Sequence, residues 1–165
     1  MIILGVDPGS TITGYAIIKK QKNKDLGVID FGCITTEGLD AEEERLKKIY
    51  KEIKKIIEKY RPTVVSIEKL FFFKNLKTAI PVSQTRGVIL LAVAEKGLPT
   101  LEFTPLQVKI TITGYGRATK KQVKEMIKRI VDIKKFDLKK NNRKKDDAFD
   151  ALGVAMCAVF ATTSC

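Results

Sequence analysis

The chain has 165 residues, enough for one well-cored domain, and 31 lysines and arginines against 19 acidic residues give it a net charge of +12. This excess favours a polyanionic partner such as nucleic acid, although charge alone suits other basic proteins too. Histidine is absent from the sequence, which excludes histidine general bases, Ser-His and Cys-His nucleophile pairs, and histidine-ligated zinc. Any catalysis therefore falls to carboxylates and lysines.

The chain opens with short apolar runs that are separated by turn residues. Residues 2–6 are apolar and β-branched, a Pro-Gly-Ser turn follows, and residues 14–18 form a second apolar run. We expect these two runs to pair as a hairpin, with a third strand over residues 27–35.

The period of the apolar residues changes after Asp40. Apolar side chains then recur at three- and four-residue steps as far as Tyr60, which predicts an amphipathic helix, and Asp40 with Glu43 matches a capping pair. Pro62 ends this helix, and residues 63–67 read as a buried strand. A helix and a strand after a hairpin favour an α/β fold with a mixed sheet flanked by helices.

Helix and strand patterns alternate in the second half of the chain. In chain order they predict a helix within residues 75–96, a strand at 100–103, and helices that begin at Pro105, at Thr119 and near Asp147. Residues 87–94 are apolar on all sides, which predicts burial on two sides, within the domain or against a partner. Without an internal repeat or a long linker, residues 1–165 should form a single domain.

The cysteines and the apolar runs indicate the cellular compartment of the protein. The three cysteines form no C-x-x-C pair, which indicates neither a zinc knuckle nor a disulfide framework and fits a reducing cytoplasm. The first apolar run is interrupted too early for a signal peptide, and no apolar stretch is long enough to span a bilayer. We therefore expect a cytoplasmic protein with no membrane partner.

Four acidic residues lie where a fold could gather them. Asp7 and Glu68 each follow an apolar strand, and neighbouring strands of one sheet bring their ends together where open sheets place their sites. An acid in such a place can also cap a loop. Asp147 and Asp150 are three residues apart and share a helix face, although acids in a first helical turn also serve the helix dipole.

Convergence of the four acids would require a cation, because carboxylates within a few ångströms raise each other's pKa. Ligation by oxygen alone selects Mg²⁺ or Mn²⁺ over zinc, and two such ions can activate water and stabilise the leaving oxygen in phosphodiester cleavage. Lys109 or Lys120 could balance charge at the scissile phosphate, although either lysine could also be an ordinary solvated residue.

Five segments together resemble a known family. They are GVDPGSTITGY at 5–15, IEKLF at 67–71, RGV at 86–88, QVK at 107–109 and DAFDAL at 147–152. In this order, over nearly the whole chain, they resemble the RuvC family of Holliday-junction resolvases. The resemblance implies a ribonuclease H-like fold and a homodimer that nicks two opposed strands of a four-way DNA junction with Mg²⁺ or Mn²⁺. It assigns the catalytic, metal-binding acids to Asp7, Glu68, Asp147 and Asp150.

One position departs from part of that family, because some members carry histidine at one of the two C-terminal metal positions. This chain has aspartate at both, which leaves open whether the final acid binds metal or activates water. The family dimerises through the helix that corresponds to residues 87–94, and RuvA and RuvB are candidate partners.

The resemblance also implies DNA contacts at Phe71, Lys109 and Lys120. An aromatic ring can stack on an unpaired base, and lysines neutralise phosphates, although Phe71 belongs to a phenylalanine run that could pack in the core. Further candidate DNA contacts are Lys74, Arg86 and Arg117.

The leading function is therefore a structure-selective endonuclease of recombination and repair, leaving 5′-phosphate and 3′-hydroxyl ends. A related nuclease acting on another branched substrate or on RNA stays open. So does a non-catalytic junction- or RNA-binding module, although a pure binder of polyanions gains nothing from four acids beside phosphate. Residues 7–11 also resemble the openings of sugar kinases and actin-like ATPases, but those proteins need two related domains and this chain is short for that.

Overall fold

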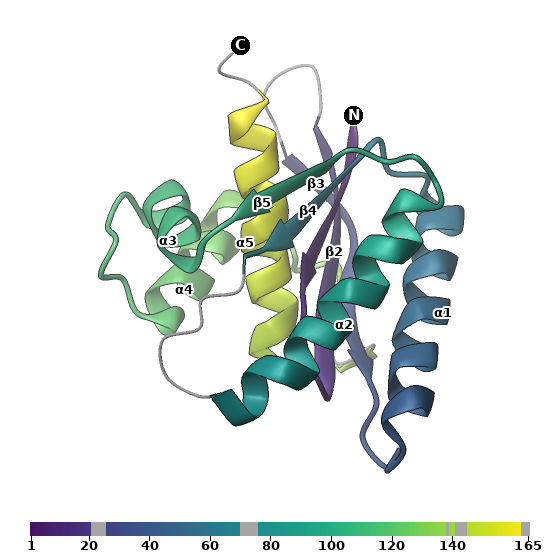
Figure 1. Cartoon of the computed structure of the whole chain (residues 1–165). Helices are drawn as coiled ribbons and strands as arrows, with labels where there is room; N and C mark the ends of the chain where they lie inside the picture. The colour runs from purple at the N-terminus through teal and green to yellow at the C-terminus, as the bar shows by residue number, and fades with distance from the viewer. Residues whose placement is uncertain (21–25, 70–75, 138, 141–144, 163–165) are drawn as a thin grey trace.

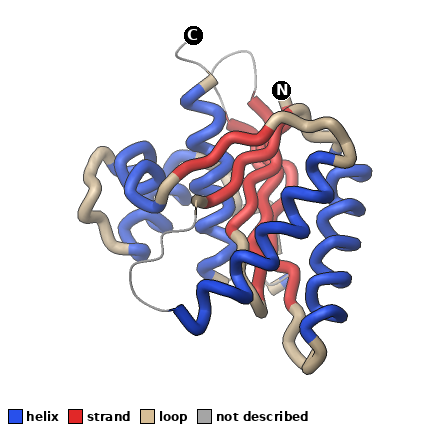
Figure 2. Tube along the Cα trace, in the orientation of Figure 1, coloured by secondary structure: helices blue, strands red, loops and turns tan. Residues whose placement is uncertain are grey.

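The computed structural model describes residues 1–20, 26–69, 76–137, 139–140 and 145–162. Its strands form one five-stranded sheet in the order β3-β2-β1-β4-β5. Their bounds are β1 Ile2–Asp7, β2 Ile12–Lys20, β3 Leu26–Thr35, β4 Val64–Glu68 and β5 Thr100–Phe103. The first three strands pair antiparallel, whereas β4 is parallel to β1 and β5 is parallel to β4. The expected mixed sheet flanked by helices is therefore confirmed (Figure 2).

Two helical layers cover the sheet (Figure 1). The helices are α1 Glu42–Tyr60, α2 Leu76–Ala94, α3 Pro105–Thr113, α4 Lys120–Ile130 and α5 Asp146–Ala161. One face of the sheet packs against α1 and α2, and the other packs against α5 with α3 and α4 beyond it. Alternate residues of β1 serve the two layers: Ile3 belongs to the α5 side and Leu4 to the α1 side, and both are fully buried.

The predicted cap of α1 is wrong. The helix begins at Glu42, its N-cap is Ala41, and no side chain caps it. Three glutamates occupy the first turn instead, where they complement the partial positive charge of the helix start. The helix is held by its apolar stripe, with Ile49 and Ile53 buried against the sheet.

Helix α2 is covered on one side only within the chain. Ile89, Ala92 and Val93 are buried, as expected for a helix that packs on the sheet. The opposite side carries large apolar residues that remain exposed, with Ile80 at 67% and Leu91 at 53% exposure. The predicted second buried side is therefore absent from the described part of a single chain.

Two glycines allow α5 to lie directly on the strands. A Cβ atom on Gly5 would collide with the carbonyl oxygen of Ala151, and one on Gly14 would collide with that of Asp147. The Ser66 hydroxyl fixes the same approach, because it donates a 2.8 Å hydrogen bond to the Val154 carbonyl. The beginning of α5 is thereby held at the end of β1.

Within the described ranges, none of the helices has both the length and the apolar character needed to cross a bilayer.

Candidate active site

Asp7 and Glu68 lie side by side because their strands are parallel neighbours. Val6 of β1 is in register with Ile67 of β4, so the next residue on each strand reaches the same edge of the sheet. Helix α5 brings Asp150 to this edge. The three acids line one cavity of about 200 Å³, here called the acidic cavity, whose other lining residues are Pro105, Val108, Lys109, Lys120 and Val123.

The acids of this cavity oppose one another's ionisation. Burial raises the pKa of Asp7 well above its usual range, and the charges of Glu68 and Asp150 raise it further. Burial also raises the pKa of Glu68, although the hydrogen bond that it shares with Asp7 acts the other way. In the absence of a cation, the folded site therefore favours a proton on this pair.

Two lysines supply counter-charge inside the cavity. The Lys120 ammonium lies 2.8 Å from Oδ2 of Asp150, and this hydrogen bond raises the pKa of Lys120, with smaller contributions from Asp7 and Glu68. Lys109 is half-buried in the same lining. Both lysines are placed to meet an anionic ligand that enters between them.

Capping boxes fix the starts of the helices that carry these lysines. Thr104 and Gln107 exchange hydrogen bonds at the start of α3, with Pro105 in the first turn, and Thr119 and Gln122 do the same at the start of α4. The first turn of each helix is thus held rigidly beside the cavity. The sequence signal for both boxes is Thr-x-x-Gln, at 104–107 and at 119–122.

Asp147 lies near the acidic cavity without lining it. Its charge contributes to the raised pKa of Asp7, but its backbone packs against Gly14 and its side chain does not line the cavity wall. Of the two aspartates on α5, Asp150 is therefore the one that faces Asp7 and Glu68 across the cavity.

The donor set of the cavity suits a hard divalent cation. It offers carboxylate oxygens only, and their mutual repulsion would be relieved by a positive ion. Across the described residues, no three Asp, Glu or Cys side chains are already arranged around a common point as metal ligands. One oxygen of Asp150 is instead engaged by the Lys120 ammonium.

The predicted DNA contacts are distributed unevenly. Lys109 and Lys120 line the acidic cavity, and Arg117 is exposed on the loop between α3 and α4. Arg86 forms an ion pair with Glu102 that joins α2 to β5, and its Nε atom is buried with no hydrogen-bond partner among the described residues, so this arginine has a structural role.

Phe71 and Lys74 lie outside the described residues, and the basic run at 139–145 is described only at its ends. Lys139 and Lys140 are exposed, and Lys145 forms an ion pair with Glu37 at 3.3 Å.

Sequence reasoning missed the residues that hold α5 against the sheet. Gly5, Gly14 and Ser66 are small residues on adjacent strands that face one helix. A run of small residues at strand positions that alternate with large apolar ones is the signal that could have identified this close approach.

Comparison with known proteins gives one consistent family. The model of the family described as crossover junction endodeoxyribonuclease RuvC matches residues 3–158. The RuvC protein of Ruminiclostridium cellulolyticum is 47% identical over 157 residues, which are 95% of this chain and 90% of that protein. The RuvC protein of Halothermothrix orenii is 49% identical over 157 residues, covering 95% and 91% of the two chains.

A solved structure agrees at the level of the fold. Thermus thermophilus RuvC in complex with a Holliday junction substrate superposes with a TM-score of 0.84 at 24% identity, covering 99% of this chain and 96% of that one. The expected ribonuclease H-like fold is thereby confirmed. From the family match and the close relatives together, the chain belongs to the RuvC family of crossover junction endodeoxyribonucleases.

Proposed function

We propose that this protein is a structure-selective endonuclease that resolves four-way DNA junctions during recombination and repair, by metal-dependent phosphodiester hydrolysis. Family membership supports the reaction and the substrate class. The observation that carries the proposal is the acidic cavity, in which Asp7, Glu68 and Asp150 converge beside two lysines. A chain that only bound DNA would gain nothing from acids placed next to a phosphate.

Nucleases of this family depend on a metal, and we propose Mg²⁺, with Mn²⁺ able to replace it and two ions per site. Asp7, Glu68 and Asp150 would hold the ions, with Asp147 on the same helix as Asp150 as a fourth ligand. When bound, the metal supplies Lewis-acid stabilisation of the phosphate and lowers the pKa of a water molecule. We assign catalytic and metal-binding roles to all four acids on this basis.

The two lysines of the acidic cavity bind the phosphate, whereas the acids bind the metal. Lys109 and Lys120 neutralise the phosphate group as it enters, and they stabilise the negative charge that develops on it. Arg117 lies on the exposed loop that links their two helices, so we assign it to the DNA backbone farther from the cut. Roles in DNA binding for Phe71, Lys74 and Arg86 stay predictions.

We propose a homodimer that buries the outer side of α2. The exposed residues on that side recur at helical spacing and form one stripe: Ile80, Ser83, Gly87, Leu91 and Ala94. Small residues in the middle let a second helix approach closely, and a Cβ atom on Gly87 would have no atom of the described residues within 4 Å. A two-fold dimer presents two equivalent sites, as symmetric cutting of opposed strands requires.

The dimer can be tested apart from chemistry. Leu91→Glu places a charge in the middle of the stripe, so sedimentation should show a monomer while circular dichroism stays unchanged. If the wild-type protein sediments as a monomer at micromolar concentration, the proposed dimer is contradicted.

We also propose that residues 1–165 form one domain, since α5 at the end of the chain packs on β1 and β2 at its beginning. A cytoplasmic location is supported by Cys33 and Cys157, which are buried free thiols. Cooperation with RuvA and RuvB stays a prediction from the family resemblance.

The test is incubation of purified protein with a labelled four-way junction and with matched linear duplex, each with and without Mg²⁺. We expect paired nicks in the junction with Mg²⁺, ends that ligase can seal, and little cutting of the duplex. Equal cutting of both substrates would indicate a less selective nuclease, and junction binding without cutting in Mg²⁺ or Mn²⁺ would contradict an enzyme.

A further inference from the structure

Strand β5 is a short edge strand that leads directly to the acidic cavity. It spans Thr100–Phe103 at one end of the sheet, and none of its residues is fully buried. Its C-terminal end continues through Thr104 into α3 (Figure 1), and α3 brings Pro105 and Lys109 to the cavity. A shift of β5 would therefore move one wall of the active site.

The same end of β5 lies beside Glu68. Glu68 of β4 is in register with Phe103 of β5. The backbone N–H group of the next residue, Lys69, donates a 2.8 Å hydrogen bond to the Phe103 carbonyl. Strand β5 therefore supports the end of β4 on the side away from β1, next to a catalytic acid of the proposed site.

The two faces of β5 are held in different ways. Leu101 and Phe103 are partly buried and pack on the α5 side of the sheet. Because successive side chains of a strand alternate, Glu102 faces the α2 side, where it forms an ion pair with Arg86. Within the described ranges, the Glu102 side chain has no other hydrogen bond or ion pair. This one contact thus links β5 to α2 through charge.

Helix α2 gives the ion pair a fixed base. Arg86 lies about one turn before Ile89, which is fully buried against the sheet with Ala92. The Arg86 side chain is 24% exposed, and its Nε atom is buried with no hydrogen-bond partner in the part of the chain that the structure describes. A guanidinium that is largely withdrawn from water stays charged, so its attraction to the Glu102 carboxylate exceeds that of a fully exposed pair.

We propose that Arg86 is a positioning residue of the nuclease and that it acts through Glu102. The ion pair fixes β5 against α2, and β5 in turn sets the position of Glu68 and of the first turn of α3. This inference rests on the proposed nuclease function, and it adds to that function a pair of residues that do not line the acidic cavity.

The alternative is a direct contact between Arg86 and DNA, the role predicted from the sequence. The surroundings of Arg86 favour the positioning role. A phosphate that approached the guanidinium would also meet the carboxylate of Glu102, whose side chain is 34% exposed, and like charges repel. The two roles differ in what they require of Glu102, because only the positioning role needs its carboxylate.

The test compares Arg86→Met, Glu102→Gln and the double variant, each in the full-length protein. Single-turnover cleavage of a labelled four-way junction is measured in Mg²⁺, and the Kd for the junction is measured in EDTA. We expect each single variant to lower the cleavage rate constant at saturating protein about tenfold, as for residues that orient metal ligands, with the Kd changed less than twofold. The double variant should be no slower than either single variant, because both changes remove the same ion pair.

A second readout does not depend on cleavage. In calorimetric titration without DNA, both single variants should bind Mn²⁺ about tenfold more weakly than the wild type, because Glu68 is less well positioned. This readout separates the two levels of the proposal. If the wild type bound Mn²⁺ but cut no junction, the nuclease function would fail, and weaker Mn²⁺ binding by both variants would still support the positioning role.

Two controls separate positioning from loss of stability. Glu95→Gln removes the 2.9 Å ion pair with Lys54 just beyond the C-terminal end of α2, so it should lower stability without changing the cleavage rate or the Mn²⁺ affinity. Exchanging the charges, with Arg86→Glu and Glu102→Arg together, restores an ion pair between α2 and β5. The exchanged protein should recover most of the lost cleavage rate.

The decisive variant is Glu102→Gln, since Glu102 lies on β5, outside the exposed stripe of α2 that adjoins Arg86. A normal cleavage rate and a normal Mn²⁺ affinity for Glu102→Gln would overturn the inference. Additive losses in the double variant would overturn it too, because the two residues would then act independently. A loss confined to Arg86→Met, seen in the junction Kd and in a weaker salt dependence of binding, would instead identify a DNA contact.

Discussion

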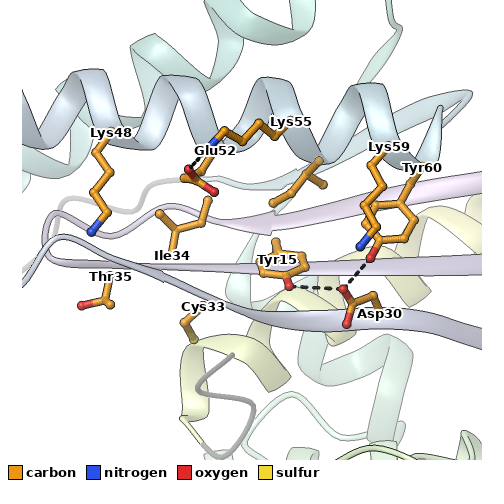
Figure 3. Close-up of a pocket in the computed structure, with 11 residues that line it drawn as sticks. Tyr15, Asp30, Cys33, Ile34, Thr35, Lys48, Glu52, Lys55, Lys59 and Tyr60 are labelled. Atoms are coloured by element: carbon orange, nitrogen blue, oxygen red, sulfur yellow. Dashed lines mark hydrogen bonds and ion pairs between the residues drawn. The ribbon is translucent and has the colours of Figure 1, made fainter. Parts of the chain in front are cut away.

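Two buried carboxylate sites on this molecule differ in how their charge is met. Between α1 and β3, Asp30 accepts hydrogen bonds from the hydroxyls of Tyr60 and Tyr15 (Figure 3) and from the backbone of Phe31. In the acidic cavity, Asp7 and Glu68 lie against each other, and the pKa of each is raised by burial. Asp30 stabilises the fold through its hydrogen bonds, whereas the acids of the acidic cavity are stabilised only when a cation or a proton binds.

A structural acid and a functional acid differ in the groups that surround their carboxylates. A carboxylate surrounded by protein donors is satisfied when the chain folds, whereas buried carboxylates that lie against one another disfavour the folded state until a proton or a cation binds. A low exposed fraction does not distinguish the two kinds. The partners of each acid do.

The largest expected effect is on cleavage. Asp7→Asn removes a ligand charge from the acidic cavity, so cleavage of a four-way junction in Mg²⁺ should fall by about a thousandfold or more, since metal catalysis supplies several kcal/mol. Binding of the junction should change little. The matched control is Asp30→Asn, whose folded fraction should cut at the normal rate, and a normal rate for Asp7→Asn would contradict the distinction.

The next largest effect is on stability, and it falls on Asp30 instead of Asp7. Asp30→Ala removes the carboxylate that accepts hydrogen bonds from two tyrosine hydroxyls and a backbone N–H, so the free energy of unfolding in urea should fall by about 2–3 kcal/mol, as for hydrogen bonds to charged groups. A loss below about 0.5 kcal/mol would show that Asp30 does not hold α1 to the sheet.

The pH dependence of stability should separate the two sites without any DNA. Because the pKa of Asp7 is raised above its ordinary 3.8, the folded protein holds a proton that the unfolded chain has released, and stability falls as pH rises through that window. Asp7→Asn should remove this decrease of stability with rising pH. In EDTA at pH 7, the Asp7→Asn variant should melt at a higher temperature than the wild type. This difference in melting temperature should disappear below about pH 4.

Added Mg²⁺ should also remove this difference at pH 7, by stabilising the wild type alone. A variant that melts below the wild type in EDTA at pH 7 would mean that the Asp7 charge is already satisfied within the protein.

The smallest effect concerns Lys120, whose ammonium occupies one oxygen of Asp150. Lys120→Met frees that oxygen, so calorimetric titration with Mn²⁺ should show affinity about two- to fivefold tighter, as expected for loss of one competing ion pair. Lys121→Met, an exposed neighbour outside the cavity, serves as the control. Weaker Mn²⁺ binding by Lys120→Met would indicate that the lysine orients Asp150 for the ion instead of competing with it.

Much of the fold follows from local patterns. Apolar runs predicted β1, β3 and β5 within a residue or two, and the stripe of α1 predicted the helix. These signals are short in range, because each depends on which face of its own element is buried. The position of Glu68 at a strand end is equally local.

The geometry of the site depends on distant contacts that no local pattern contains. The parallel pairing of β1 with β4 joins residues some sixty positions apart, and it alone places Asp7 beside Glu68. The helix spacing treats Asp147 and Asp150 alike, but the backbone of Asp147 lies against Gly14, and of the two only Asp150 lines the cavity. The side exposed on α2 was likewise beyond prediction, since it depends on what covers the helix.

The most direct test of the acidic cavity is diffraction from crystals grown with Mn²⁺ and measured at the manganese absorption edge. We expect an anomalous peak between the carboxylates of Asp7, Glu68 and Asp150, with Lys120 moved off Asp150. Saturating Mn²⁺ with no peak in that cavity, and with Lys120 still paired to Asp150, would contradict it.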